Sequence, residues 1–322
     1  MSLAFIFPGQ GSQSVGMGEA VWEAFPSARD VHAEVDDVLD QKLSAIMFNG
    51  PLEDLTLTAN AQPALMTASV AVMRVLAHDF DLPVTTASYV AGHSLGEYSA
   101  LCAAGALGLA DTARLLKLRG EAMQQAVPVG DGAMAALLGA SLQDADAICA
   151  QARDKAGAGA VVEIANDNAP GQVVISGTRA AVEAAVELSG DHGVKKAVLL
   201  PVSAPFHCSL MQPAADGMAE ALGDTDIRKP EVALVNNVRA EALTDPKLIR
   251  TDLVRQVTGR VRWRESVQWM HARGVTATAE PGTGRVLTQM NRRIARDLSG
   301  AALSTPADIE AFAHSIHQEL EN

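Results

Sequence analysis

The sequence predicts an α/β fold in which a large domain with a mainly parallel sheet is interrupted by a smaller unit. In the first third of the chain, short apolar runs typical of buried strands alternate with longer helical segments. The same alternation resumes after residue 203. Between these halves, strands and helices follow in the order β-α-β-β-α-β, the ferredoxin-like pattern. We therefore expect a discontinuous large α/β domain at residues 1–127 and 203–322 and a ferredoxin-like subdomain at residues 128–202.

The elements of the large domain follow from apolar runs and the residues that end them. The first run, "LAFIF", meets Pro8-Gly9 and has no basic segment before it, so it predicts a buried strand rather than a signal peptide. In the first half we expect elements at Leu3–Phe7, Pro63–His78, Tyr89–Ala91, Leu95–Ala104 and Leu109–Ala126. In the second half we expect a helix near Ser209–Leu222, a strand at Val232–Val235, helices near Asp252 and Arg264, a strand at Val275–Ala279 and a helix at Val286–Ala295.

The expected subdomain contains a capped helix and a tight turn. Asp144 follows Ser141 by three residues, which is a capping-box signal for a helix that starts at Ser141. The letters "NDNAPG" at residues 166–171 predict a turn between two strands. The other elements are expected at Ala133–Leu138, Val161–Ala165, Val173–Ser176, Ala180–Leu188 and Lys196–Leu200.

Composition excludes several classes of protein. Of the 322 residues, 48% are hydrophobic, which is enough for a sizeable core and argues against disorder. No apolar segment is long enough to span a bilayer, and a formal net charge of −13 argues against nucleic-acid binding. The three cysteines, Cys102, Cys149 and Cys208, lack metal-ligand spacing. They predict free thiols in a reducing, cytoplasmic environment and no metal site.

The stretch "YVAGHSLGEYSAL" from Tyr89 contains the pattern G-x-S-x-G, with Ser94 at its centre. A strand is expected before this pattern and a helix after it, so the serine would sit on a sharp strand-to-helix turn that exposes its hydroxyl group. The N–H of Leu95 would then be free at a helix N-terminus to bind an oxyanion. The local context favours Ser94 as a nucleophile over a structural serine.

A serine nucleophile needs a base, and eight histidines are available. Four of them lie in polar, helix-like segments and are expected at the surface: His32, His78, His314 and His317. His93 adjoins Ser94, but successive side chains of a strand point to opposite faces. His207 lies in "PVSAPFHCSLM", between a loop punctuated by prolines and a predicted helix, a position typical of catalytic groups. We favour His207 as the base, with a structural loop histidine as the alternative.

One charged residue falls on the apolar face of a predicted helix. Within "ARLLKLRGEAMQQA", Arg119 lies three or four residues from apolar Leu115, Leu116, Ala122 and Met123. Lys117 and Glu121 lie on the polar face. A buried guanidinium needs an anion or several acceptors. The structural alternatives are an internal ion pair or an arginine that extends its charge to solvent. The functional interpretation is a planar fork for the carboxylate of a substrate.

The glycine-rich segment "PGQGSQSVGMG" follows the first predicted strand. It matches neither G-x-x-x-x-G-K-[ST] nor G-x-G-x-x-G, so a phosphate-binding loop is disfavoured. A loop in this position could still bring backbone N–H groups beside Ser94.

Taken together, these segments resemble the malonyl-CoA:acyl carrier protein transacylase family of fatty acid synthesis. The resemblance runs nearly end to end and in order, through "FPGQGSQ", "GHSLGEYSAL", "RGEAMQ", "GAMAALLG", "NAPGQVVISG", "LPVSAPFHCSLM", "LVRQV" and "EPGTGRVL". It implies an α/β-hydrolase-like large domain with a ferredoxin-like insert. It also implies a bacterial type II acyltransferase that carries malonyl groups on a serine.

The resemblance assigns roles to individual residues. Ser94 matches the acyl-accepting nucleophile and His207 its base, without a third acidic member. Gln10 matches the second oxyanion-hole donor beside the Leu95 N–H, and Arg119 the arginine that pairs with the malonyl carboxylate. Gln256 matches the residue whose main-chain carbonyl orients the histidine. Phe206, before His207, resembles malonyl-selecting rather than methylmalonyl-selecting members.

The expected substrates and partners follow from that family. They are malonyl-CoA and an acyl carrier protein that brings its own phosphopantetheine, with no permanently bound cofactor, no nucleic acid, no membrane and a monomeric enzyme. One alternative interpretation of the turn around Ser94 is a serine esterase or thioesterase. A second alternative is a non-catalytic subunit of a synthase. Because carrier and chain are both acidic, docking needs a local basic patch. The candidates are Lys195, Lys196, Arg260, Arg262 and Arg264.

Overall fold

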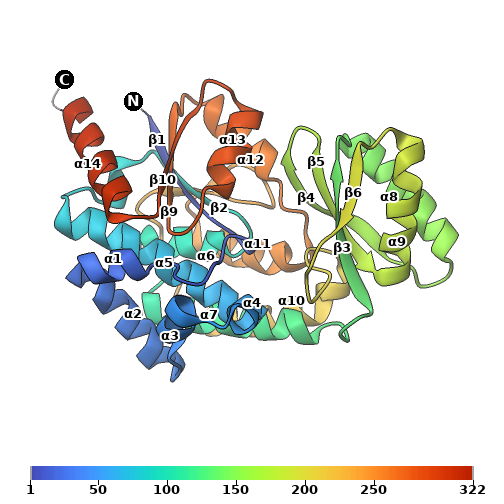
Figure 1. Ribbon diagram of the computed structural model, residues 1–322, viewed down its shortest axis with the longest axis horizontal. Coiled ribbons are helices and arrows are strands. Elements are labelled where there is room, and N and C mark those ends of the chain that lie inside the picture. Colours follow the sequence, from blue (N-terminus) through green and yellow to red (C-terminus); the bar gives the residue numbers. More distant parts are fainter. Residues whose placement is uncertain (1, 321–322) are drawn as a thin grey trace.

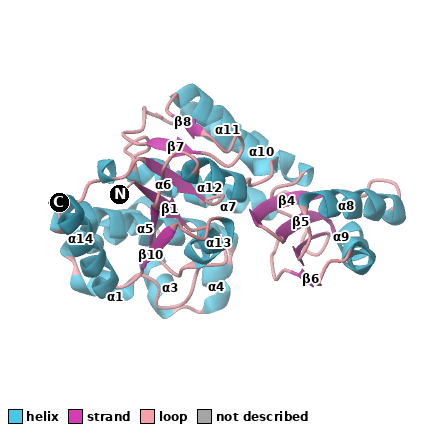
Figure 2. Ribbon diagram, turned by 90° about the horizontal axis from the view of Figure 1, so that it is seen from above, coloured by secondary structure: helices cyan, strands magenta, loops and turns pink. Residues whose placement is uncertain are grey.

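The computed structural model describes residues 2–320 and contains two sheets (Figure 1). The first sheet has six strands in the order β10-β9-β1-β2-β7-β8, and the second has four in the order β4-β5-β3-β6. The second sheet and its helices form a separate lobe beside the first (Figures 1 and 2). The predicted α/β class is confirmed, with a mostly parallel large sheet and a smaller antiparallel one.

The large sheet is built around a fully buried central strand. β1 (Leu3–Phe7) pairs in parallel with β2 (Tyr89–Gly92) on one side and with β9 (Ala277–Pro281) on the other. The sheet continues in parallel to β10 (Ser299–Leu303) and to β7 (Ala233–Val235), and only β8 (Ala242–Leu243) is antiparallel.

The two faces of β1 enter different cores, as the period of a strand requires. Phe5 and Phe7 pack in the core on the side of α5 (Thr58–Asp79) and α6 (Gly96–Ala103). Ala4 and Ile6 pack in a second core with α12 (Trp263–His271) and α13 (Val286–Ile294). The helical layers on both faces explain why this strand is apolar without alternation.

The remaining helices of the large domain complete these layers. Expected helices are found at α7 (Leu109–Gln125), α10 (Gln212–Asp224) and α11 (Pro246–Thr258). The sequence did not predict the strands β8 and β10. It also did not predict five α-helices: α1 (Glu19–Ala24), α2 (Pro26–Leu39), α3 (Leu43–Asn49), α4 (Leu52–Thr56) and α14 (Pro306–Leu320).

The smaller sheet is antiparallel throughout and carries its two helices as the ferredoxin-like order requires. Its elements are β3 (Gly132–Leu138), α8 (Leu142–Ala156), β4 (Val162–Ala169), β5 (Gln172–Thr178), α9 (Arg179–Leu188) and β6 (Lys196–Leu199). The predicted capping box of α8 is confirmed, because the Asp144 N–H donates to Ser141 Oγ at 3.1 Å and the Ser141 N–H donates to Asp144 Oδ2 at 2.9 Å. The boundaries at residues 127 and 203 stay a prediction.

The expected turn at residues 166–171 is wrong in its first four positions. β4 continues to Ala169, and only Pro170-Gly171 connects it to β5. The pairing of β4 with β5 shifts register between Ile164 and Asn166 and again between Asp167 and Ala169. These β-bulges accommodate polar residues in a strand and redirect their side chains.

The bulged strand also joins the two lobes. The Val261 N–H donates to the Ala165 carbonyl at 2.8 Å, and the Asp167 N–H donates to the Val261 carbonyl at 2.9 Å. Arg264 on α12 donates to buried Asp167 Oδ2 through two nitrogens, at 3.0 and 2.8 Å. One face of the small subdomain is thereby fixed against the large domain beside Ser94.

Candidate active site

Ser94 lies at the turn between β2 and α6, with a φ of 55° in the left-handed region that non-glycine residues rarely adopt. The two flanking glycines make this turn possible. A Cβ at Gly92 would lie 1.9 Å from the Gly96 carbonyl carbon, and a Cβ at Gly96 would lie 2.3 Å from the Phe7 oxygen. The turn therefore has the strained geometry that the sequence pattern predicted.

A buried asparagine holds this turn from the neighbouring strand end. Asn237 Oδ1 accepts the Ser94 N–H at 2.8 Å, and Asn237 Nδ2 donates to the Gly92 carbonyl at 2.7 Å. Both contacts fix the backbone on either side of His93. Nothing in the local sequence around Asn237 indicated this role, because it depends on β7 lying beside β2.

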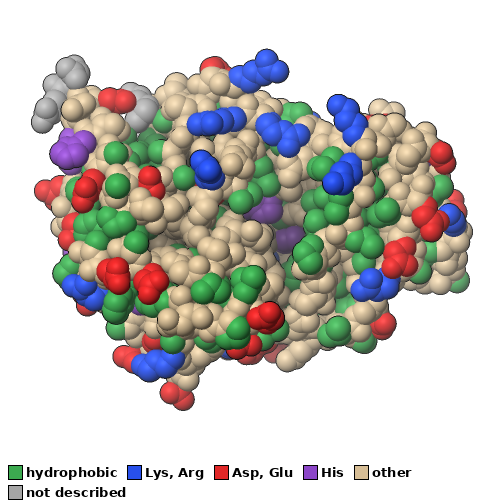
Figure 3. All heavy atoms as spheres, in the orientation of Figure 1, with side chains coloured by type: hydrophobic (Ala, Val, Ile, Leu, Met, Phe, Trp, Pro, Cys, Tyr) green, Lys and Arg blue, Asp and Glu red, His purple; other side chains and the backbone are tan. Residues whose placement is uncertain are grey.

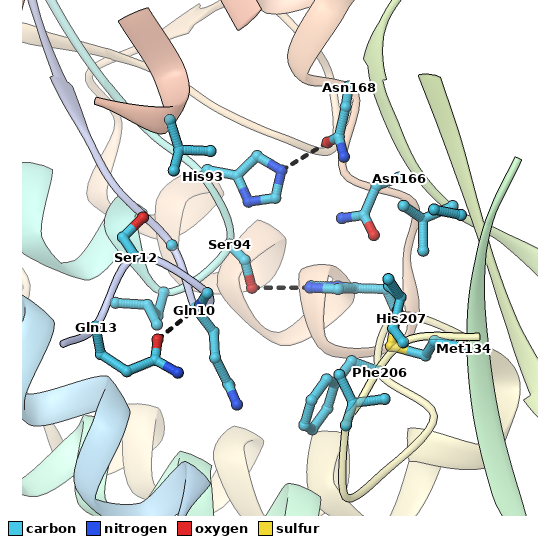
Figure 4. Close-up of a pocket in the computed structure, with 18 of the residues that line it drawn as sticks. Gln10, Ser12, Gln13, His93, Ser94, Met134, Asn166, Asn168, Phe206 and His207 are labelled. Atoms are coloured by element: carbon cyan, nitrogen blue, oxygen red, sulfur yellow. Dashed lines mark hydrogen bonds between the residues drawn. The ribbon is translucent and has the colours of Figure 1, made fainter. Parts of the chain in front are cut away.

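His207 faces Ser94 across the cavity (Figure 4). Its Nε2 is 2.8 Å from Ser94 Oγ, and its Nδ1 is 2.9 Å from the Gln256 main-chain oxygen. Because that carbonyl can only accept, Nδ1 carries the proton and Nε2 is left to accept the one on Ser94. Burial, and secondly the charge of Arg119, lower the pKa of His207 to about 3. The imidazole is therefore neutral at pH 7 and ready to act as a base.

Arg119 on α7 is 1% exposed, although it is one of the largest side chains in the chain. Its Nη1 donates to Gln62 Oε1 at 2.8 Å, and its Nη2 donates to Gln256 Oε1 at 3.0 Å and to Ser94 Oγ at 3.2 Å. Within residues 2–320 it forms no ion pair with a carboxylate, and its Nε has no partner. A buried cation beside the nucleophile, held by neutral amides, fits an arginine that receives its anion from a substrate.

Gln10 and Leu95 line the same cavity as Ser94. In the described part of the chain, no acceptor binds the main-chain N–H of either residue. Both donors are thus available for an oxyanion formed at Ser94. The side chain of Gln10 turns the other way, where its Nε2 donates to Thr58 Oγ1 at 3.4 Å.

The cavity has a volume of about 580 Å³ and lies between the two lobes. The small subdomain contributes β3, β4 and β5 residues, including Met134, Asn166 and Asn168, whose side chains face the cavity in Figure 4. Figure 3 shows the same region as a hollow with histidine side chains inside it. Phe206 also lines this cavity beside His207.

His93 differs from its expectation, because it also lines the cavity. Its Nε2 lies 2.8 Å from Asn168 Oδ1, and its ring packs 5.8 Å from that of Trp263. Burial lowers the pKa of His93, so the ring is neutral and bridges the two lobes. His32 was expected at the surface but is 1% exposed, with Nδ1 2.8 Å from the Ala28 carbonyl.

The described residues contain no cluster of side chains suited to a metal ion. The three cysteines are free thiols. None of the helices between residues 2 and 320 combines the length and apolar character needed to cross a membrane.

The candidate docking cations divide into two groups. Arg260 and Arg262 pair with Glu265, and Arg264 pairs with Asp167, so these three serve the local structure. Lys195 and Lys196 are exposed at the start of β6 and form no ion pair within the described residues.

Known proteins are similar to this chain over nearly its whole length. The acyl transferase domain model matches residues 4–305. A malonyl CoA-acyl carrier protein transacylase of Bacillus subtilis (strain 168) is 45% identical over 321 residues, which cover 99% of each chain. The chain belongs to the malonyl CoA-acyl carrier protein transacylase family.

Solved structures of the transacylase family agree with this assignment. An acyl-carrier-protein-S-malonyltransferase from Bartonella henselae is 53% identical, with a TM-score of 0.95 over 98% of this chain and 100% of that one. A malonyl-transacylase in complex with a type II PKS acyl-carrier protein is 41% identical, with a TM-score of 0.93 over 98% of this chain and 100% of that one. The second relative was therefore solved with a carrier protein bound.

Proposed function

We propose that Ser94 and His207 carry out malonyl transfer by a ping-pong route. The chain is a malonyl-CoA:acyl carrier protein S-malonyltransferase of fatty acid synthesis, with malonyl-CoA as donor and acyl carrier protein as partner. The observation that carries the residue roles is the 2.8 Å contact between Ser94 Oγ and His207 Nε2, with Arg119 Nη2 3.2 Å from the same oxygen.

In the first half-reaction, Ser94 Oγ attacks the malonyl thioester while His207 Nε2 takes its proton. The main-chain N–H groups of Leu95 and Gln10 hold the oxyanion, and each contributes roughly 3 kcal/mol in the transition state. The carbon–sulfur bond then breaks, and the sulfur of coenzyme A leaves with the proton from His207. The product is malonyl-Ser94.

In the second half-reaction, the phosphopantetheine thiol of the carrier protein takes the place of coenzyme A. His207 removes the thiol proton as the sulfur attacks the ester carbon of malonyl-Ser94. The bond to Oγ breaks, and the proton returns from His207 to Ser94. The Gln256 carbonyl, 2.9 Å from Nδ1, keeps Nε2 directed at Ser94 in both halves.

Arg119 supplies the selectivity for malonyl groups. No carboxylate of the described residues contacts its buried guanidinium, so a substrate without an anion leaves this desolvated charge without a contacting counterion. A malonyl carboxylate supplies that partner beside Ser94. The serine esterase and the non-catalytic subunit are both disfavoured by this arrangement.

The test is malonyl transfer from coenzyme A to carrier protein, compared with acetyl and methylmalonyl transfer. We expect malonyl to be preferred and Ser94→Ala to abolish transfer while the protein stays folded. Unimpaired transfer by Ser94→Ala would contradict the assignment. Ser99→Ala is a control, because Ser99 is buried on α6 away from the cavity and its hydroxyl has no partner within the described chain.

We further propose that the carrier protein docks on basic residues beside the cavity. Figure 3 shows Lys and Arg side chains grouped along the upper edge, on both sides of the hollow. Lys195 and Lys196 on the small subdomain are exposed. Charge reversal at Lys195 and Lys196 should raise KM for the carrier protein at low salt and leave KM for malonyl-CoA unchanged. Equal KM values for carrier protein in variant and wild type would contradict this surface.

The remaining proposals concern the setting of the enzyme. Nucleophile, base and arginine all come from one chain, which supports a monomer without a resident cofactor. Three free thiols and no disulfide within residues 2–320 support a cytoplasmic enzyme.

A further inference from the structure

We propose that Glu97 is a positioning residue that fixes the orientation of the Gln256 side-chain amide and thereby holds Arg119 ready for the malonyl carboxylate. This inference rests on the proposed function of Arg119. It assigns a role to the buried side chain of Glu97 on α6, the helix that follows Ser94, which the mechanism above does not use.

Glu97 lies in the first turn of α6 and is 1% exposed. Each of its oxygens accepts one hydrogen bond. Oε1 accepts the main-chain N–H of Asn237, and Oε2 accepts Gln256 Nε2 at 2.6 Å. The first donor belongs to the backbone and cannot turn, so the glutamate is held in place and its second oxygen always faces Gln256.

This acceptor selects one of the two orientations that the Gln256 amide can take. In the observed orientation, Nε2 donates to Glu97 and also to the Ser94 carbonyl at 3.0 Å, while Oε1 accepts Arg119 Nη2 at 3.0 Å. The reversed amide would place its oxygen against two acceptors and its NH₂ group against the guanidinium. A carboxylate at position 97 therefore sets which atom Gln256 presents to Arg119.

The burial of Glu97 supports its role in orienting the Gln256 amide. Burial raises the pKa of Glu97, whereas the hydrogen bonds from the Asn237 N–H and from Gln256 Nε2 lower it, so these two donors favour the ionised form that accepts at both oxygens. A buried carboxyl group is costly unless its contacts compensate for lost hydration. A carboxylate accepts from both donors that face this position, the Asn237 N–H and Gln256 Nε2. The amide of a glutamine has one oxygen and would accept from only one of them.

The chain thus uses Gln256 in two ways. Its main-chain oxygen orients His207, and its side-chain amide connects Glu97 to Arg119. The first use serves every acyl group, because it acts on the base. The second serves acyl groups that carry an anion, because it acts on Arg119.

The decisive variant is Glu97→Gln, assayed as acylation of Ser94 by malonyl-CoA and by acetyl-CoA. The new NH₂ group must face Gln256, because the other site is taken by the Asn237 N–H. Arg119 then loses its acceptor on Gln256, and a hydrogen bond to a charged group is worth about 10- to 150-fold. We expect the ratio of malonyl to acetyl kcat/KM to fall by about this factor, because malonyl acylation falls more than acetyl acylation.

A purely structural role for Glu97 would lower both rates together and leave the ratio unchanged, which would overturn the proposal. Ser99→Ala, two residues along α6, controls for a buried substitution in the same helix and should keep the wild-type ratio. Malonyl transfer by the wild-type protein tests the proposed function separately. If the wild type showed no malonyl preference, the role of Arg119 would fail, whereas a wild-type preference unchanged in Glu97→Gln would contradict Glu97 alone.

A double-mutant cycle shows whether Glu97 acts through Gln256. Gln256→Leu removes the amide and keeps the main-chain carbonyl, so it should lower the same ratio. In that background, Glu97→Gln should lower the ratio no further. An equal further fall would overturn the proposal. If Glu97→Gln does not fold, Glu97→Asp decides, because its shorter side chain cannot reach both the Asn237 N–H and Gln256 Nε2. A reduced ratio supports the proposal, and a wild-type ratio overturns it.

Discussion

Arg119→Lys tests the proposed carboxylate site most severely, because it keeps the charge and removes the fork. Arg119 uses two nitrogens to reach Gln62 Oε1 at 2.8 Å, Gln256 Oε1 at 3.0 Å and Ser94 Oγ at 3.2 Å. A single ammonium group cannot reach partners on both sides and also bind a carboxylate through two bonds. Loss of one charge-assisted bond costs about 1.5–3 kcal/mol, which corresponds to a factor of about 10 to 150.

We therefore expect kcat/KM for malonyl-CoA to fall by about 10- to 150-fold in Arg119→Lys, and kcat/KM for acetyl-CoA to fall much less. Rapid-quench measurement of the acyl-enzyme with each thioester gives both values. Arg114→Lys is the control, because Arg114 lies on the exposed face of the same helix and pairs with Asp111 at 3.5 Å. Equal losses for both thioesters, or an unchanged malonyl preference, would refute the role of Arg119.

Four further predictions rest on the burial of His207 and on the close packing around Gly92 and Gly9. Burial and the Arg119 charge lower the pKa of His207 from 6.5 to about 3, so kcat/KM for acylation should not change as the pH falls through 6.5. A kcat/KM that falls by half at pH 6.5 would contradict a neutral His207. The same shift makes the stability contribution of His207 complete above pH 6.5 and progressively lost toward pH 3, which denaturant titrations at pH 7 and pH 5 can measure. Gly92→Ala should abolish activity, since its Cβ would lie 1.9 Å from the Gly96 carbonyl carbon, and an active, folded variant would show that the turn is not required. Gly9→Ala, whose Cβ would lie 2.7 Å from the His93 oxygen, should displace the Gln10 N–H and lower kcat by about 100- to 1,000-fold, whereas Gly217→Ala in open space on α10 should not.

The features that the sequence predicted depend on residues that lie close together in the chain. The run before Gly92 and the small residues after Gly96 identified the strand, the helix and the strained serine between them. The capping box at Ser141 likewise marked the start of α8, because both of its partners lie within four residues. Arg119 was recognisable because it is a charged residue on the apolar face of its helix.

The features that were missed depend on contacts between distant segments. Glu97 and Asn237 lie 140 residues apart, and each acquires its meaning only when β7 pairs with β2 and α11 approaches α6. Asn166 and Asn168 read as turn residues, since asparagine and proline favour turns, but bulges and the contact with Val261 keep them in a strand. β10 was missed because "SGAAL" has small residues in place of the β-branched ones typical of strands.

The central claim is that Ser94 holds a malonyl group that is released to a thiol. Intact mass spectrometry of the enzyme mixed with malonyl-CoA, followed by peptide mapping, measures this directly. We predict one malonyl adduct on Ser94 that persists in buffer and disappears within a turnover when holo carrier protein is added. An adduct on another residue, or one that is lost to water as fast without carrier protein as with it, would contradict the account.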